Sequence, residues 1–288
     1  MGWADMAVEV VTTIAEVRQR TDAVRRHGGT VGLAPTMGYL HDGHVSLFER
    51  SVAECSFTVA TVFVNPLQFA PTEDLAAYPR DPDGDIALAD AAGVDVMFMP
   101  SADEMYPRPV LTTVSVADIS ATMEGASRPT HFAGVATVVA KLLAIVGPCR
   151  AYFGEKDYQQ VAVVRRMASD LSLPVEVVAC PTLREPDGLA RSSRNVHLTA
   201  DERAVAPVLH RALQLGASLI RDGETDANVV RTRMSTMIDQ ALGGELDYVE
   251  VADPDTLQTQ VRCGPHSRLF GAIRFGRARL IDNVGVTR

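Results

Sequence analysis

The feature that most constrains the fold is a His-x-Gly-His turn at residues 41–44, which joins two segments of different periodicity. Residues 30–34 are apolar and partly β-branched, which predicts a buried strand, and residues 45–55 carry apolar side chains at helical spacing. The two histidines therefore lie where a strand passes into a helix. The first N–H groups of a helix lack intrahelical partners and carry the positive end of its dipole, so this turn favours anions such as phosphate. Gly43 has no Cβ and lets a ligand approach the backbone.

Strand-like and helix-like segments alternate from residue 30 to about residue 180. The predicted strands are residues 30–34, 58–64, 94–99, 150–154 and 175–180. The predicted helices after the first one are residues 85–92, 131–146 and 158–171. Such repetition implies a Rossmann-like α/β domain, with a mostly parallel sheet and helices on both faces. We expect it to cover residues 1–183 and to bind ligands at the carboxyl ends of its strands.

The pattern changes after Pro181. A polar loop at residues 184–188 precedes two predicted helices and three predicted strands. The helices are residues 200–220 and 227–242, and the strands are residues 247–251, 269–275 and 278–281. Gly276-Arg277 predicts a hairpin between the last two strands. Residues 184–288 are therefore expected to form a smaller α+β domain that closes over the site as a lid.

The composition limits the classes of partner. The chain has 288 residues, is 47% hydrophobic and carries a formal net charge of -9, so a nucleic acid or an anionic membrane is not expected as the main ligand. No run of 18 or more apolar residues occurs, so no membrane span is expected. The four cysteines are scattered without a C-x-x-C pair, which predicts reduced thiols in a cytoplasmic protein. Any phosphate site must be local.

The histidine spacing also permits a second interpretation. Residues three apart share a helical face, as in a metal pair, but no third ligand follows nearby, so phosphate is favoured. Imidazole N–H groups can bind phosphate oxygens, where a transition state concentrates negative charge. The chain lacks a G-x-x-x-x-G-K-[ST] loop and a G-x-G-x-x-G turn, so neither a P-loop protein nor a conventional dinucleotide-binding protein is predicted.

Two further polar segments follow predicted strands. Residues 152–160 leave a strand and open a helix, so Lys156 lies at the carboxyl end of that strand; the alternative is a solvated surface charge. Residues 188–195 carry two hydroxyls and two guanidiniums. Hydroxyl donors and an arginine that grips two oxygens suit a polyphosphate, while the alternative is a helix-capping turn with solvated arginines.

Five sequence blocks occur together in order. They are residues 35–38 with His41 and His44, residues 63–69, residues 124–132, residues 152–160 and residues 192–195. Together they resemble the pantothenate synthetase (pantoate-β-alanine ligase) family, over about residues 30 to 200. That family belongs to the wider H-x-G-H nucleotidylyl-transferase group, and the Ser-Ser-Arg segment resembles the mobile lysine-serine loop of that group.

The resemblance implies an ATP-dependent ligation in two steps. The carboxylate of pantoate attacks the α-phosphorus of ATP to give pantoyl adenylate and pyrophosphate. The amine of β-alanine then attacks the activated carbonyl, giving pantothenate for coenzyme A (vitamin B5) biosynthesis and releasing AMP. ATP is a substrate, Mg²⁺ accompanies it, and a homodimer is expected.

The resemblance also implies roles for individual residues. The catalytic residues are His41, His44, Lys156 and Arg194. His44 is the proton donor, and His44, Lys156 and Arg194 are the positive donors to phosphate. The residues implied in ATP binding are Met37, Gly38, Tyr39, Leu40, His41, Asp42, Gly43, His44, Gly154, Glu155, Lys156, Asp157, Leu183, Arg191, Ser192, Ser193 and Arg194. Gln68 serves pantoate and β-alanine, and Gln160 serves pantoate. Met37 and Phe69 line the apolar side of the pantoate site by the same resemblance, while their residue types fit a core position equally well.

Some positions remain open or depart from the family. Some relatives carry two adjacent acids and a downstream Gln associated with Mg²⁺; here only Asp85 is kept, so either Asp85 is the protein ligand or Mg²⁺ is held mainly by the ATP phosphates and water. Arg191 replaces the Met or Leu of many relatives, and either adds a phosphate contact or points outward. Glu124, Arg128 and His131 either serve the site or form a helix start, in which Thr130 is the cap and Arg128 pairs with Glu124.

Two other functions fit parts of the pattern. A nucleotidylyltransferase would leave AMP or CMP on a phosphorylated acceptor, but such an acceptor calls for additional basic residues where Gln68 and Gln160 are expected. A nucleotide-binding regulatory module would tolerate the loss of His44 or Arg194. Every phosphate donor that the ligase requires is present, so the ligase is favoured.

Overall fold

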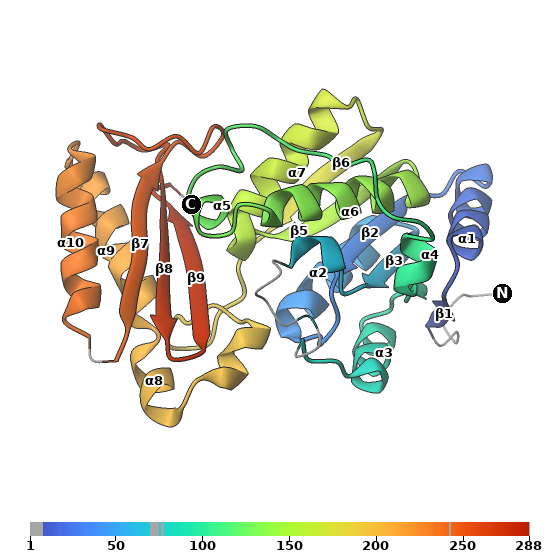
Figure 1. Ribbon diagram of the computed structural model, residues 1–288, viewed down its shortest axis with the longest axis horizontal. Helices are drawn as coiled ribbons and strands as arrows, with labels where there is room; N and C mark the ends of the chain where they lie inside the picture. The colour runs from blue at the N-terminus through green and yellow to red at the C-terminus, as the bar shows by residue number, and fades with distance from the viewer. Residues whose placement is uncertain (1–7, 70–74, 76–77, 242, 288) are drawn as a thin grey trace.

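Residues 9–180 fold around a six-stranded parallel sheet (Figure 1). The computed structural model describes residues 8–69, 75, 78–241 and 243–287. The strands are β1 (Glu9–Val11), β2 (Val31–Thr36), β3 (Phe57–Val62), β4 (Val96–Phe98), β5 (Cys149–Gly154) and β6 (Val175–Cys180). Their order in the sheet is β1-β4-β3-β2-β5-β6. The chain builds outward from β2 in one direction and from β5 in the other, so the topological switch point lies between β2 and β5.

Helices cover both faces of this sheet, as expected for the fold class. The helices in this part of the chain are α1 (Ile14–Arg26), α2 (Asp42–Glu54), α3 (Pro82–Ala91), α4 (Ala102–Met105), α5 (Glu124–Ser127), α6 (His131–Val146) and α7 (Tyr158–Asp170). Alternate residues of β5 enter different cores. Ala151 and Phe153 pack with α6 and α7, while Tyr152 packs with Phe48 of α2 on the other face. The predicted Rossmann-like architecture is confirmed.

The C-terminal part forms a second sheet, which is antiparallel. It contains β7 (Glu245–Ala252), β8 (Arg268–Phe275) and β9 (Ala278–Gly285) in the order β7-β8-β9. The predicted hairpin is confirmed, because Phe275 pairs with Ala278 across Gly276, whose φ is +47°. Two helices, α9 (Val208–Arg221) and α10 (Ala227–Asp239), pack against this sheet (Figure 1). The first sheet ends at Cys180, and we keep the domain boundary at residue 183 as a proposal.

Several predicted boundaries shift for identifiable reasons. The single helix expected over residues 200–220 is wrong: α8 (Ala200–Val205) and α9 are separated at Pro207, which has no N–H to donate and whose ring clashes with the preceding turn. β9 runs to Gly285 instead of residue 281, because the buried polar pair Asp282 and Asn283 hides the strand pattern. Leu242, the expected end of a helix, lies outside the described residues.

Two N-terminal elements were not predicted. β1 has three residues, too few to show a period of two. The start of α1 is a capping box, in which Thr13 accepts a hydrogen bond from the Glu16 N–H and the Glu16 carboxylate accepts one from the Thr13 N–H. No helix within the described part of the chain has the length and apolar character needed to cross a membrane.

Candidate active site

A cavity of about 600 Å³ lies at the switch point, where the carboxyl ends of β2 and β5 meet. Its wall contains most of the residues expected in the site. These are Met37, His41, Gly43, His44, Gln68, Gly154, Lys156, Asp157, Gln160, Leu183, Arg191, Ser192, Ser193 and Arg194. The expected residues outside its lining are Gly38, Tyr39, Leu40, Asp42, Asp85 and Glu155. Most of these support residues that do line it.

The two histidines cap the helix that carries them. His41 is the N-cap of α2, and its Nδ1 accepts a hydrogen bond from the Gly43 N–H at 3.1 Å. The Nδ1 of His44 accepts one from the His41 N–H at 3.3 Å, and the two rings lie 4.1 Å apart between centroids. Backbone N–H groups can only donate, so Nδ1 of each ring is unprotonated and Nε2 carries the proton. Each neutral imidazole can therefore donate one hydrogen bond through Nε2.

Gly43 makes this arrangement possible. A Cβ on residue 43 would lie 2.8 Å from Cε1 of the His41 ring, closer than side-chain atoms pack. The glycine of the His-x-Gly-His turn is therefore needed to seat the capping imidazole. The sequence suggested a different reason for this glycine, namely access of a ligand to the backbone. That access is also provided, because Gly43 lines the cavity.

Both imidazoles are neutral near pH 7. Burial, followed by the charge of Lys156, lowers the pKa of His41 from 6.5 to about 4. Burial, followed by His41, lowers the pKa of His44 from 6.5 to about 3. The expectation that His44 acts as a positive donor is therefore corrected: in this structure it is a neutral N–H donor, and the cations of the cavity are lysine and arginine.

Asp85 supports the turn that precedes the histidines. Its buried carboxylate accepts hydrogen bonds from the N–H groups of Tyr39 at 3.0 Å and Leu40 at 2.6 Å. Gly38 and Tyr39 have φ values of +81° and +51°, so the backbone turns sharply there and directs both N–H groups at the carboxylate. These hydrogen bonds connect the turn that follows β2 to α3.

This use of Asp85 does not fit a metal ligand. Both carboxylate oxygens are engaged by the backbone, and Asp85 is not part of the cavity lining. Among the residues that the structure describes, no group of three or more His, Cys, Asp or Glu side chains is arranged to hold a metal ion. The expectation of Asp85 as a protein ligand for Mg²⁺ is replaced by a structural role, because its oxygens satisfy N–H groups that would otherwise be unpaired.

Lys156 reaches the cavity from a short 3₁₀ helix, η2 (Glu155–Asp157), directly after β5. Its side chain is 15% exposed, and its Nζ lies 3.3 Å from Asp157 Oδ1. Burial alone would raise the pKa of Asp157, but Lys156 and then Arg194 outweigh it, and the pKa is lowered. A carboxylate thus lies among cations that come from two distant segments. This mixture of charges can hold an anionic ligand and orient it at the same time.

The Ser-Ser-Arg loop is tied to the histidine helix. Arg191 forms ion pairs with Asp42 in the first turn of α2 and with Glu185 at 3.3 Å. Ser192 caps the 3₁₀ helix η3 (Ser193–His197) by accepting a hydrogen bond from the Arg194 N–H. Arg191 therefore does not point outward, and its guanidinium already pairs with two carboxylates. It joins the loop to the helix start.

The glutamine side chains occupy different environments. Gln68 is 8% exposed; its Oε1 accepts a hydrogen bond from Asn65 and its Nε2 contacts the Met37 sulfur. Gln160 lines the cavity, and its amide has no hydrogen-bond partner among the described residues. Its neighbour Gln159 instead stabilises the loop before α5, because its Nε2 donates hydrogen bonds to two carbonyls of that loop. Gln160 is thus available to a ligand, whereas Gln159 is not.

Asn65 supports the site through Gln68, a role that sequence reasoning missed. It is 1% exposed, donates to Gln68 and to the Gly134 carbonyl, and accepts a hydrogen bond from the Tyr106 hydroxyl at 2.9 Å. Its place directly after β3, within a matched block, was the available signal. Asn65 fixes the orientation of the Gln68 amide, because its own N–H can only point at an oxygen.

The open alternatives for residues 124–131 are partly resolved. Glu124 forms an ion pair with Arg279 of β9 at 2.6 Å and accepts a hydrogen bond from Tyr248 of β7. Thr130 occupies the N-cap position of α6 but makes no side-chain capping bond, so the expected cap is wrong. Arg128 and His131 line the cavity, and both donate to the carbonyl of Gln68.

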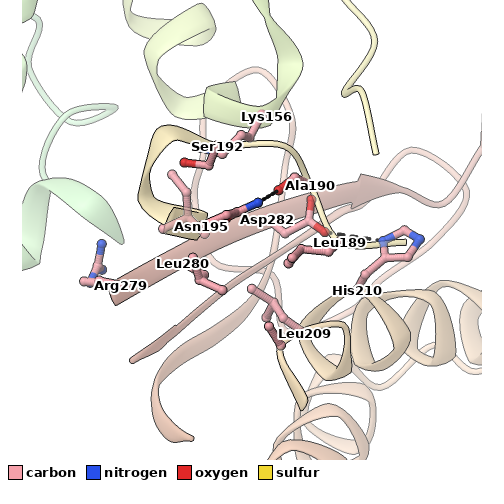
Figure 2. A pocket seen from close by; sticks show the side chains of 12 residues that line it. Lys156, Leu189, Ala190, Ser192, Asn195, Leu209, His210, Arg279, Leu280 and Asp282 are labelled. Atoms are coloured by element: carbon pink, nitrogen blue, oxygen red, sulfur yellow. Dashed lines mark hydrogen bonds and ion pairs between the residues drawn. The ribbon is translucent and has the colours of Figure 1, made fainter. Parts of the chain in front are cut away.

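A second, much smaller pocket of about 10 Å³ adjoins the cavity (Figure 2). Lys156, Ser192 and Asp282 line both spaces, while His210 lines only the small pocket. This volume is about that of one water molecule. Two of the phosphate-binding candidates therefore border the same small pocket as residues of β9 and α9, which no sequence motif indicated.

Comparisons with known proteins agree with this geometry. The sequence model of the family described as pantoate-beta-alanine ligase matches residues 9–285. A pantothenate synthetase of Herpetosiphon aurantiacus is 50% identical over 278 residues, covering 96% of this chain and 99% of the relative. One of a Roseiflexus species is 51% identical over 276 residues, covering 96% of this chain and 98% of the relative.

Solved structures show the same similarity. A pantothenate synthetase of Thermus thermophilus superposes with a TM-score of 0.91 at 48% identity, covering 98% of this chain and 100% of that chain. A pantoate-beta-alanine ligase of Francisella tularensis, complexed with beta-gamma ATP and beta-alanine, superposes with a TM-score of 0.78 at 31% identity. That alignment covers 97% of this chain and 98% of the other.

Proposed function

The chain belongs to the pantoate-β-alanine ligase family, and we propose that it joins pantoate to β-alanine through a pantoyl adenylate formed from ATP. One observation carries this proposal. Two neutral imidazole donors, the Lys156 ammonium and the Arg194 guanidinium line a single cavity at the switch point. The ATP and β-alanine complex of the Francisella ligase supports the choice of substrates.

In the first step the carboxylate of pantoate attacks the α-phosphorus. A carboxylate is ionised near pH 7 and needs no base, so the site contributes alignment and charge neutralisation. An O–P bond forms, the bond between the α-phosphorus and the bridging oxygen breaks, and pyrophosphate leaves. Lys156 and Arg194 offset the charge that develops on the phosphates, and hydrogen bonds to charged groups contribute about 1.5 to 3 kcal/mol each.

The histidines contribute directional donors to this step. Because His41 and His44 are neutral, each Nε2–H donates to a phosphate oxygen without moving a proton from the ring. The N-terminus of α2 adds its dipole at the same place. The backbone caps at Nδ1 hold the rings before ATP binds, so little reorganisation is needed in the transition state.

In the second step the amine of β-alanine attacks the carbonyl carbon of the adenylate. A C–N bond forms, the bond from that carbon to the phosphate oxygen breaks, AMP leaves, and the attacking nitrogen releases one proton. We assign pantoate to Gln68 and Gln160, with Met37 and Phe69 on its apolar side; all four line the cavity. An amide offers both donors and an acceptor, which matches hydroxyls and a carboxylate on one substrate.

The adenosine end of ATP is assigned to Gly154, Asp157 and the backbone near Leu183, at the end of β5. Mg²⁺ is assigned to the phosphates of ATP, since Asp85 does not fit a protein ligand. We also propose a homodimer, as expected for the family. The four free cysteines support a reducing, cytoplasmic environment.

Exchange of labelled pyrophosphate into ATP tests the adenylate. The assay contains pantoate and Mg²⁺ but no β-alanine, so only the reversible first step can incorporate label. Exchange that requires pantoate is the expected result. Folded protein that makes pantothenate but shows no exchange would contradict the adenylate route, and folded protein that makes neither would contradict the function itself.

A further inference from the structure

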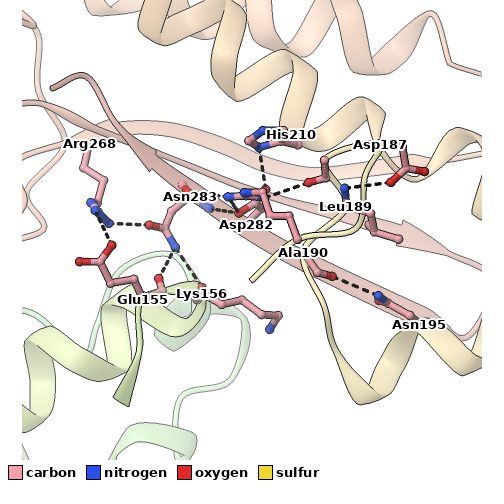
Figure 3. Close-up of polar contacts among 12 residues, drawn as sticks. Glu155, Lys156, Asp187, Leu189, Ala190, Asn195, His210, Arg268, Asp282 and Asn283 are labelled. Carbon is pink, nitrogen blue, oxygen red and sulfur yellow. Dashed lines mark hydrogen bonds and ion pairs between the residues drawn. The ribbon is translucent and has the colours of Figure 1, made fainter. Parts of the chain in front are cut away.

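Asn283 of β9 contacts the backbone that carries Lys156 (Figure 3). Its Nδ2 donates hydrogen bonds to the carbonyls of Glu155 at 2.8 Å and Lys156 at 2.9 Å. Its Oδ1 accepts one from Arg268 Nη1 at 2.7 Å. Two carbonyls require the amide N–H₂ and a guanidinium requires the oxygen, so the amide has one orientation and every polar atom is satisfied. The residue is only 5% exposed, although it also lines the large cavity.

The segment that Asn283 contacts is not fixed by its own sequence. Neither η2 nor the start of α7 has a side-chain capping bond. The restraints come instead from the C-terminal sheet. Arg268 of β8 forms an ion pair with Glu155 at 3.5 Å and stacks on the Tyr158 ring, with its guanidinium carbon 3.6 Å from the ring centroid. Asn283 is the member of this group that bonds the Lys156 peptide itself.

The neighbouring residue, Asp282, restrains the other phosphate-binding segment. Its carboxylate lies 3.3 Å from His210 Nδ1 (Figure 3). It also accepts hydrogen bonds from Arg184 at 2.6 and 2.9 Å. Arg184 also donates to the carbonyl of Gly188, at the base of the loop that carries Ser192. Of two adjacent residues of one strand, Asn283 therefore bonds the Lys156 segment directly, and Asp282 holds the base of the Ser-Ser-Arg loop through Arg184.

From this arrangement we infer that Asn283 is a positioning residue for the ligase reaction, acting through Lys156. It fixes the peptide of Lys156 relative to β9, while Asp282 fixes the opposing loop relative to the same strand. The distance between the Lys156 ammonium and the donors of the Ser-Ser-Arg loop is thereby held constant. A polyphosphate that binds both groups at once requires such a fixed distance. This inference rests on the proposed function, because it needs Lys156 to contact the phosphates of ATP.

A double-mutant cycle read out by ATP binding tests the inference. The dissociation constant for ATP is measured by calorimetry with Mg²⁺ and without pantoate, for wild type, Asn283→Ala, Lys156→Ala and the double variant. Asn283→Ala is expected to weaken ATP binding about tenfold in the wild-type background and less than about twofold when Lys156 is absent. Equal factors in both backgrounds, or no effect in either, would overturn the inference.

Two further variants separate positioning from general stability. Asn283→Asp keeps the side-chain shape and the contact to Arg268 but removes both donors, so it should also weaken ATP binding; unchanged binding would overturn the inference even if Asn283→Ala fails to fold. Arg231→Ala is the matched control, because Arg231 links α10 to Glu250 of β7 at 2.8 Å without lining the cavity. It should lower thermal stability and leave ATP binding unchanged.

Failure of the proposed function gives a different result. If wild-type protein binds no ATP and shows no pyrophosphate exchange, the ligase assignment fails whatever Asn283 does. Wild-type protein could instead bind ATP and exchange pyrophosphate while the effects of Asn283→Ala and Lys156→Ala on ATP binding simply add. In that case only the role of Asn283 fails.

Discussion

At the scale of single residues, the histidine pair shows how a helix cap can prepare a donor. A capping side chain is ordinarily Ser, Thr, Asp or Asn, whose oxygen accepts the backbone N–H. Here imidazole nitrogens accept instead, at His41 and His44. The cap therefore selects the tautomer, and the tautomer places the proton on Nε2. Because burial keeps both rings neutral, the pair supplies directed hydrogen bonds, and the cavity's full positive charges come from other residues.

Removing a phosphate donor should abolish the first step. His44→Ala and Lys156→Ala are each expected to lower the rate of pantoate-dependent pyrophosphate exchange at least about 100-fold, because their donors act on charge that develops in the transition state. His27→Ala and Lys141→Ala are matched controls, since neither side chain lines the cavity, and both should retain exchange. Folding is checked by circular dichroism; near-normal exchange in a folded His44 or Lys156 variant would contradict the assignments.

The lowered pKa values of the histidines also predict a pH dependence of stability. Between pH 6.5 and about pH 4, unfolded histidines bind protons that His41 and His44 do not bind when folded, so the free energy of unfolding falls as the pH falls. The loss is at most about 2 kcal/mol per histidine between pH 6.5 and about pH 5. Urea unfolding of a His41→Gln, His44→Gln variant should show a flatter slope in this window. An unchanged slope would contradict the neutral pair.

At the scale of elements, the turn from β2 to α2 depends on a helix that lies further along the chain. Tyr39 has a φ of +51°, a backbone conformation that is costly for a residue with a Cβ. Asp85 of α3 supplies the compensation by accepting two N–H groups of that turn. The turn, the capping histidines and α3 therefore form one unit, and the position of the histidines depends on a buried carboxylate outside their motif.

Replacing that carboxylate should affect stability and leave metal use unchanged. Asp85→Asn substitutes an N–H₂ for one acceptor and leaves a buried N–H unpaired, which costs about 1 to 3 kcal/mol. Asp83→Asn, on the exposed side of α3, is the control and should be neutral. The Mg²⁺ concentration for half-maximal exchange should stay the same in both variants. A large rise for Asp85→Asn without loss of stability would restore Asp85 as a metal ligand.

At the scale of the whole molecule, the two sheets are joined by buried polar contacts next to the cavity. Glu124, from the parallel-sheet half, forms an ion pair with Arg279, which also pairs with Asp247 at 2.7 Å. The side chains of Arg279 and Glu124 are only 15% and 12% exposed. One cation thus serves two carboxylates from different parts of the chain. Hydrophobic residues of the second sheet, such as Phe270, extend the core of the first.

Truncating the shared cation should destabilise the whole molecule. Arg279→Ala leaves the carboxylates of Glu124 and Asp247 without their cation, and removing one partner of a buried pair costs about 3 to 5 kcal/mol. Arg166→Ala removes an exposed pair with Asp170 and should cost less than about 1 kcal/mol. Chemical denaturation measures both. Equal, small effects would mean that the contact between the sheets contributes little.

Local patterns were sufficient for much of the architecture. The predicted ranges of β6 and α6 agree with the observed ones, because their apolar periodicity is a property of consecutive residues. The His-x-Gly-His turn likewise indicated a strand-to-helix corner, since strand, glycine and helix start are adjacent in sequence. The matched blocks brought Gln68 and Lys156 to the same cavity, because parallel strands place their carboxyl ends at one edge.

Only the tertiary structure decided how individual polar side chains are used. Asp85 was expected at a metal and instead holds a turn, and Asn283 had no motif although it bonds the peptide of Lys156, 127 residues away. A sequence shows which donors and acceptors exist, but burial removes water as a partner, and the folded chain then determines which groups must satisfy one another. The sequence by itself determined the order of elements and the nucleotide corner. Packing decided the charge state of the histidines and the supports of the site.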